Sequence, residues 1–366
     1  MPHSTAKRLF FSYMGVSPLC EASRRAIARF LDDYVKLGPP EVIEKYQGYV
    51  RKLSEEVALL LHCDPEEVIY VKNTGEGLIM ASEALPLGKG DEVLVLGNEY
   101  PANLMPWLKL KKDEVKVQVI PGMDNHGGFL ELLSRIGPKT KAVAIAWGQH
   151  FDGYLPNLAL LSRRCGKYGA YLVVDGVQGV GARAIDLRKT PVDFLISGGQ
   201  KYLGSIVGSG FMYVNRRTMG KLKDSHVGIR SVEQFDEHGY ILRKTAARFQ
   251  DGTENLLGIV ALHAAVKAVN RVGIKEIEKK NLALLASLKT MLREDDIPFI
   301  DHRQQTNVVA LTVHDPVSLA TRLRTQNIYT RPVKGVERIS FTHTTRERDL
   351  RKLVTEIKAC LSHAVS

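Results

Sequence analysis

The strongest constraint on the fold is a regular alternation of short apolar runs with longer amphipathic stretches between residues 92 and 214. The apolar runs predict strands, and the amphipathic stretch Leu158–Tyr168, which ends at Gly169, predicts one of the intervening helices. Strands that alternate with helices form βαβ units and a parallel, doubly wound sheet. The predicted strands are Glu92–Leu96, Val115–Ile120, Ala142–Trp147, Ala170–Asp175, Phe194–Ser197 and Gly210–Val214.

The pattern changes near residue 255 and predicts a second, smaller domain. Two long helical stretches follow, Leu256–Val272 and Lys275–Arg293, and then short strands and a last helix. A chain of 366 residues has room for about two domains. We expect residues 1–20 to pack on the small domain, residues 21–255 to form a large α/β domain, and residues 256–366 to form a small α+β domain. Its remaining predicted elements are Val308–Val313, Ile328–Val333, Arg338–Phe341 and Arg346–Ser362.

Cysteine usage and charge limit the class of protein and its partners. Cys20, Cys63, Cys165 and Cys360 form no CxxC pair, so we expect a reducing compartment, the cytoplasm, and neither disulfides nor a metal site. The first residues lack the apolar core of a signal peptide, and no apolar run approaches the ~20 residues that span a bilayer. The net charge of 51 − 40 = +11 is spread along the chain, so we expect neither nucleic acid nor membrane as a partner.

Two charged residues follow neighbouring predicted strands. Asp175 ends one strand, and Lys201 lies shortly after the end of the next. Ligands of open parallel sheets bind outside the carboxyl ends of the strands, so this carboxylate and this amine can share a crevice. The Gly-rich stretches 176–181 and 204–210 match neither GxGxxG between a strand and a helix nor GxxxxGK[ST], so no nucleotide site is predicted.

These residues also carry a resemblance to a known family. Asp175-Gly-x-Gln178, with Lys201 of a Ser-Gly-x-x-Lys segment 26 residues after Asp175, is similar to the class V aminotransferases and cysteine desulfurases. Those enzymes have the fold of type I pyridoxal phosphate (PLP) enzymes. Further segments resemble that family in the same order: Asn73–Gly77, Glu99–Asn103, Phe249–Asn255 and Arg338–Phe341.

The resemblance implies a PLP site. Lys201 would form a Schiff base with the cofactor, which a desolvated lysine does readily, and could then carry a proton at the α-carbon. Asp175 would pair with the pyridine nitrogen and Gln178 with the ring oxygen, while Tyr100 would stack on the ring. The phosphate would be held at a helix N-terminus. Its expected ligands are Thr74, the backbone amides of Gly75 and Glu76, Ser197, and Gln200, which replaces the histidine of many relatives.

The same resemblance implies a substrate site and a homodimer. Arg338 would bind the α-carboxylate of an amino acid through the two-pronged contact that a guanidinium provides. His150 would lie near the cofactor oxygen or the substrate, although an ordinary structural histidine is an equal alternative. Thr253 would reach the phosphate bound by the neighbouring subunit, which would make the active unit a homodimer.

Two differences from the desulfurase sequences reduce the number of reactions that we expect. The stretch Ile328–Glu337 lacks the nucleophilic cysteine that desulfurases carry before the arginine, and Cys360 lies in the last predicted helix. Persulfide-forming desulfuration is therefore not expected. Tyr100 stands where desulfurases have histidine, which is similar to isopenicillin N epimerase-like, C–S lyase-like and aminotransferase-like branches.

The sequence does not decide between four functions. We expect aminotransferase-type chemistry first, then β-elimination by a C–S lyase, and then epimerisation. A catalytically silent dimeric relative is a different class, which the presence of Lys201 and Asp175 disfavours. The substrate side chain is undetermined, and Arg230, Arg331 and His343 are candidates for its pocket.

Overall fold

A seven-stranded sheet forms the centre of the computed structural model, which describes residues 8–122 and 125–362. The strand order is β2-β8-β7-β6-β5-β3-β4, and β3 to β7 run parallel, whereas β8 is antiparallel to both of its neighbours. The predicted α/β class with a mainly parallel sheet is therefore confirmed. The strands are β2 (Val68–Val71), β3 (Glu92–Leu96), β4 (Lys116–Ile120), β5 (Thr140–Ala146), β6 (Tyr171–Asp175), β7 (Phe194–Gly198) and β8 (Gly210–Val214).

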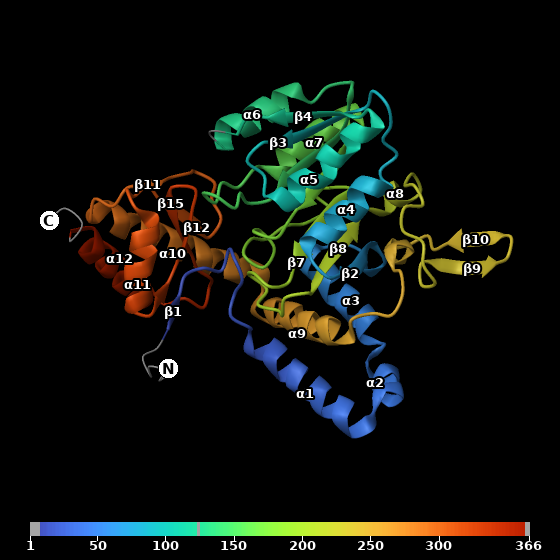
Figure 1. Cartoon of the computed structure of the whole chain (residues 1–366), viewed down its shortest axis with the longest axis horizontal. Coiled ribbons are helices and arrows are strands. Elements are labelled where there is room, and N and C mark those ends of the chain that lie inside the picture. Colours follow the sequence, from blue (N-terminus) through green and yellow to red (C-terminus); the bar gives the residue numbers. More distant parts are fainter. Residues whose placement is uncertain (1–7, 123–124, 363–366) are drawn as a thin grey trace.

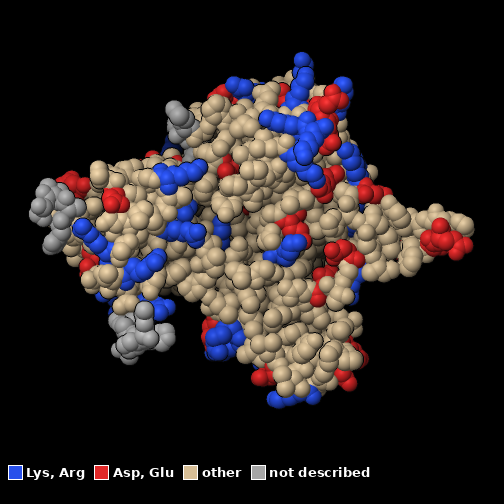
Figure 2. Space-filling view, viewed as in Figure 1, with Lys and Arg blue, Asp and Glu red and all other residues tan. Residues whose placement is uncertain are grey.

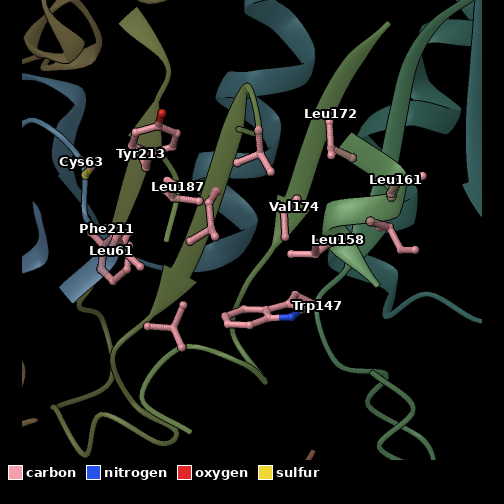
Figure 3. Packing of buried hydrophobic residues seen from close by; sticks show 14 of the residues in the cluster. Leu61, Cys63, Trp147, Leu158, Leu161, Leu172, Val174, Leu187, Phe211 and Tyr213 are labelled. Carbon is pink, nitrogen blue, oxygen red and sulfur yellow. The ribbon is translucent and has the colours of Figure 1, made fainter. Parts of the chain in front are cut away.

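Helices cover both faces of this sheet, which explains why its strands are uniformly apolar. In β6, Leu172 and Val174 belong to the apolar cluster under α3, α6, α7 and α9, whereas Val173 belongs to the cluster under α4 and α5. Figure 3 shows the first cluster, with Trp147 below Val174. The helices are α3 (Tyr49–Leu61), α4 (Thr74–Ala84), α5 (Pro101–Lys109), α6 (Asn125–Arg135), α7 (Leu158–Tyr168) and α9 (Leu256–Val272).

Capping interactions at both ends determine where helix α7 begins and ends. The side chain of Asn157 accepts a hydrogen bond from the backbone N–H of Leu160 and so caps the start of α7. Gly169 ends the helix at a φ of 68°, a left-handed conformation that glycine adopts without strain. Both predicted boundaries of this helix are confirmed.

A second, antiparallel sheet lies beside the first, at the left of Figure 1. Its order is β11-β12-β15-β14, and its core includes residues of α10, α11 and α12. The predicted strand Ile328–Val333 is two short strands, because β13 leaves this sheet to pair in parallel with β1. The elements are β1 (Leu9–Phe10), α10 (Ile274–Glu294), β11 (Phe299–Ile300), β12 (Val308–Leu311), α11 (Pro316–Thr325), β13 (Ile328–Tyr329), β14 (Arg331–Val333), β15 (Val336–Ser340) and α12 (Glu347–Ser362).

A hairpin that the sequence did not predict projects from the large unit at the right of Figure 1 as a separate two-stranded sheet. It consists of β9 (Val232–Asp236) and β10 (Gly239–Leu242), and its tip carries acidic side chains (Figure 2). Phe235, Tyr240 and Ile241 are exposed on it, so the strands lack the buried alternation that identifies a strand in sequence.

The remaining elements complete the large unit. The described elements also include α1 (Glu21–Leu37), α2 (Pro39–Tyr46), α8 (Arg216–Met219) and the 3-10 turns Pro65–Glu67, Leu110–Asp113 and Ala246–Phe249. Helix α1 packs along α9. In the described part of the chain no single helix is long and apolar enough to cross a membrane. Helices α9 and α10 reach that length and apolar composition only when they are taken together, and the pair is bent by 77°.

Candidate active site

Asp175 and Lys201 interact at the carboxyl ends of the adjacent strands β6 and β7. Asp175 is 3% exposed, and its Oδ1 accepts a hydrogen bond from the backbone N–H of Val177 at 3.1 Å. Burial raises the pKa of Asp175, while the charge of Lys201 lowers it. Burial lowers the pKa of Lys201 to about 8; Asp175 opposes this shift, whereas Arg338 and Arg331 add to it. The site thus contains an amine that loses its proton near neutral pH, next to a buried carboxylate.

The N-terminus of α4 lies against the end of β7. The hydroxyl oxygen of Thr74 accepts a hydrogen bond from the backbone N–H of Gly198 at 2.9 Å and so joins the two elements. The backbone N–H of Glu76 already donates to Asn73 Oδ1 at 2.9 Å, whereas the amides of Thr74 and Gly75 have no acceptor among the described residues. An anion expected at this helix end would therefore contact these two amides before that of Glu76.

Three polar side chains surround the strand ends. Gln178 is 2% exposed; its Nε2 donates to the Met14 carbonyl at 3.2 Å, and its Oε1 has no partner in the described part of the chain. Ser197 is buried and donates to the Gly198 carbonyl at 3.2 Å. The Oε1 of Gln200 is buried without a partner among the described residues. Each of these two buried amide oxygens can accept a hydrogen bond from a ligand or from water.

Tyr100 and His150 form the opposite wall. Tyr100 precedes α5, is 55% exposed, and packs edge-to-face on His150 with ring centroids 5.4 Å apart. Burial, followed by the charges of Arg338 and Lys201, lowers the pKa of His150 to about 4. His150 is therefore a neutral imidazole at pH 7, and the open face of Tyr100 is available for a planar ligand.

Sequence reasoning assigned no role to Glu99, which holds this wall in place. Its carboxylate is 4% exposed and accepts hydrogen bonds from the Ala146 backbone (3.0 Å), Gln149 Nε2 (2.8 Å) and Asn103 Nδ2 (3.0 Å). Burial raises the pKa of Glu99 to about 7. The signal available in the sequence was its position immediately before Tyr100, in the segment that resembles the ring-stacking motif.

Arg338 reaches the site from β15 of the small sheet. It is 7% exposed, and its Nη1 donates to the His150 carbonyl at 2.6 Å, whereas its Nε has no partner in the described chain. Burial, with help from the charge of Arg331, lowers its pKa to about 10, so it stays protonated at pH 7. The guanidinium therefore presents donors to the site while it anchors the loop that follows β5.

Close contacts between the two sheets fix the position of Arg338. His302 Nε2 lies 2.7 Å from Asp152 Oδ2, and Asp152 is buried. Arg183 Nη1 donates to Asn307 Oδ1 at 2.6 Å. A Cβ on Gly153 would collide with the carbonyl oxygen of Val308, so only glycine allows the loop after β5 to approach β12 this closely.

The four remaining candidate residues from the sequence lie in different parts of the structure. Arg331 is directly opposite Arg338 in the β14–β15 pair. Arg230 is exposed at the base of the β9–β10 hairpin, where its carbonyl accepts a hydrogen bond from Arg243. His343 is half-buried in the small unit, and burial and Lys280 lower its pKa. Thr253 is exposed and makes no side-chain hydrogen bond within the described part of the chain.

Comparison with known proteins identifies the family of the chain. The family model described as aminotransferase class-V matches residues 35–353. A probable cysteine desulfurase of Pyrococcus abyssi is 30% identical over 274 residues, 72% of this chain and 68% of that protein. The uncharacterized aminotransferase YcbU of Bacillus subtilis is 25% identical over 95% of this chain and 93% of its own length.

Solved structures share the fold across nearly the whole chain. A C-DES mutant with glycine covalently linked to its PLP cofactor superimposes with a TM-score of 0.88 at 20% identity, covering 96% of this chain and 97% of that one. With a family model that spans residues 35–353, the chain belongs to the class V aminotransferase family of PLP-dependent enzymes.

Proposed function

We propose that the enzyme acts at the α-carbon of an amino acid through Lys201, and that its reaction is of the aminotransferase type. The observation that carries the proposal is the facing pair of Lys201 and Asp175 at adjacent strand ends, between the N-terminus of α4 and Arg338. Asp175 and Lys201 offset each other's charge, while the first turn of α4 and the Nε of Arg338 keep donors without a partner in the described part of the chain.

The residues present fit PLP. The free amides of Thr74 and Gly75 suit its phosphate, because a helix N-terminus favours an anion. Asp175, which has a single backbone donor, suits the ring nitrogen, and the unpaired amide of Gln178 suits a ring oxygen. Tyr100 offers an exposed ring face beside them.

The chemistry follows from what each group can hold or move. When bound, PLP supplies an electron sink that stabilises negative charge at the substrate's α-carbon. Lys201, with its pKa lowered to about 8, can accept and return a proton at its Nζ near neutral pH. The buried Asp175 carboxylate favours a protonated ring nitrogen, and the Arg338 guanidinium orients the α-carboxylate. His150, neutral at pH 7, can donate or accept a hydrogen bond without adding charge.

β-Elimination is the second candidate, because several relatives are named cysteine desulfurases. Three of the four thiols do not suit the persulfide step of a desulfurase, and the fourth, Cys20, caps the N-terminus of α1. Cys63 and Cys165 are buried, which raises the pKa of each to about 12, and burial also raises the pKa of Cys360 in α12. If C–S cleavage occurs, elimination without a thiol nucleophile fits this chain better.

The proposed active unit is a homodimer in the cytoplasm. Thr253 is exposed and its side chain makes no hydrogen bond to another described residue, and the β9–β10 hairpin presents Phe235, Tyr240 and Ile241 to solvent. An exposed apolar surface of this kind favours association. Light scattering on the purified protein tests the dimer.

The proposed cytoplasmic location rests on the cysteines. All four are free, which supports a reducing compartment.

Reconstitution with PLP tests the cofactor assignment. We expect a yellow protein whose visible band disappears in Lys201→Ala and persists in Lys275→Ala, an exposed lysine on α10. A colourless wild type that cannot be loaded would contradict the proposal.

Product analysis with single amino acids then tests the reaction. Pyridoxamine phosphate with a keto acid identifies transamination, whereas a keto acid with ammonia identifies β-elimination. Solvent deuterium at an α-carbon of altered chirality identifies epimerisation. Either of the last two results in the absence of the first would overturn the aminotransferase assignment.

A further inference from the structure

Two arginines lie side by side at the substrate end of the site. Arg331 on β14 and Arg338 on β15 are directly opposite each other in an antiparallel pair. Side chains of opposite residues project from the same face of a sheet, with Cβ atoms about 5 Å apart. Arg338 points to the site, because its Nη1 bonds the His150 carbonyl. Arg331, which is exposed, therefore leaves the sheet on the same face as Arg338.

The N-terminal segment positions the guanidinium of Arg331. An ideal Cβ on Gly15 would lie 2.8 Å from Arg331 Nη1, so the guanidinium rests on the backbone of Gly15. The preceding residue, Met14, accepts a hydrogen bond from Gln178 through its carbonyl. Gln178 follows β6 three residues after Asp175, so Arg331 is placed at the rim of the same crevice, on the side next to Arg338.

The buried carboxylate of Glu337, next to Arg338 on β15, partly offsets the charge of Arg338, but burial raises the pKa of that carboxyl to about 7. Among the ion pairs of the described residues, none joins a carboxylate within 4 Å to Arg331 or Arg338. Like charges placed directly opposite across two strands repel each other. The charges of both arginines also disfavour the protonated form of Lys201. Figure 2 shows Lys and Arg side chains gathered on the small lobe and at its junction with the large one.

One α-carboxylate would neutralise one of these two guanidiniums and leave the other unpaired. We propose that Arg331 binds a second carboxylate, and that the substrate is an amino acid whose side chain ends in such a group. This assignment rests on the proposed function, in which Arg338 binds the α-carboxylate. A pair of neighbouring guanidiniums matches two carboxylates on one short chain, since each supplies parallel N–H donors in a fixed plane.

Binding of unreactive acids to the PLP-loaded protein tests the proposal without turnover. Glutarate and valerate have the same number of carbons, and only glutarate has a second carboxylate. In calorimetric titrations at low salt we expect glutarate to bind roughly tenfold or more tightly than valerate, as a charged hydrogen-bonded pair allows. Arg331→Gln should abolish this preference, whereas Arg338→Gln should weaken both acids.

Two further variants separate this role from a structural one. Gly15→Ala keeps Arg331 but displaces the flexible end of its side chain, so it should reduce the glutarate preference and leave valerate binding unchanged. Arg348→Gln removes an exposed arginine of the small unit and should change neither acid. In turnover, Arg331→Gln should lower kcat/KM for L-glutamate relative to L-glutamine, mainly through KM.

The outcomes distinguish this inference from the proposed function. Equal binding of glutarate and valerate by the wild type, or equal losses for both acids in Arg331→Gln, overturns the second-carboxylate site. Failure to take up PLP, seen as a missing visible band, overturns the proposed function instead. The same titrations on that unloaded protein would still decide whether the arginine pair prefers two carboxylates.

Discussion

The two ends of the site are built on opposite electrostatic principles. At the cofactor end, the charges of Asp175 and Lys201 face each other across adjacent strands of one sheet. At the substrate end, Arg331 and Arg338 are like charges on adjacent strands of a different sheet, and neither forms an ion pair within the described part of the chain. The first end is largely balanced before a substrate arrives, whereas the second is complete only when an anion binds.

This difference separates what each end contributes. A balanced buried pair sets protonation states, because each partner stabilises the charge of the other. An unbalanced pair of guanidiniums attracts and orients an anion, because binding removes their mutual repulsion. Mutations at the cofactor end should therefore act on the chemical step, and those at the substrate end on binding.

The largest effect is expected from Asp175→Asn, which removes the negative member of the balanced pair. Loss of one preorganised electrostatic contact lowers kcat by on the order of 100-fold to 1,000-fold. Steady-state kinetics with the best amino acid measures this, and KM should change little. The pH dependence of the visible band should also change, which a purely structural defect would not produce.

Arg338→Gln should give the next largest effect, and on binding. Removing charge-assisted hydrogen bonds costs about 2–3 kcal/mol, so kcat/KM should fall by about 30-fold to 150-fold through KM. Arg338→Lys keeps the charge without the fork and should recover part of the loss. A large fall in kcat with an unchanged KM would contradict the view that the substrate end acts on binding and the cofactor end on the chemical step.

Two glycine-to-alanine substitutions, one near each end of the site, disturb the two ends separately. In Gly77→Ala the new Cβ would lie 2.7 Å from Ile196 Cγ2 and push α4 away from β7. In Gly153→Ala the new Cβ would strike β12, at a φ of 79° that disfavours alanine. Each should lower the free energy of unfolding by about 1–3 kcal/mol in urea titrations. Gly77→Ala should mainly weaken PLP binding, and Gly153→Ala should mainly raise the KM of the amino acid.

The smallest expected effect is a shift in the titration of Lys201. Its free-base form increases as the pH rises through a pKa of about 8, so condensation of PLP with the cofactor-free protein should accelerate over that range. Arg331→Gln removes a cation that disfavours the protonated amine, so its midpoint should move to higher pH. Stopped-flow absorbance measures both midpoints. A lower midpoint in Arg331→Gln would show that the arginine does not act on Lys201.

Much of the cofactor end could be predicted from the sequence. Asp175 and Lys201 each follow a strongly apolar strand, and parallel neighbouring strands bring their carboxyl ends to one edge. The β9–β10 hairpin escaped prediction because its apolar side chains are exposed and carry no buried alternation. Glu99 escaped because its role depends on donors from Asn103, Ala146 and Gln149, which belong to two separate segments.

The sequence by itself determined the parallel sheet, the pairing of a carboxylate with an amine at its edge, and the resemblance to the family. Those features depend on periodicity and on residues within one run of βαβ units, which local physics fixes. Only the tertiary structure decided that Arg331 faces Arg338, that Gly15 supports its guanidinium, and that the Glu76 amide is already bonded. The arginine pair depends on the register of the β14–β15 hairpin, the Gly15 contact joins segments that are distant along the chain, and the Glu76 bond depends on the rotamer of Asn73. None of these leaves a periodic signal in the sequence.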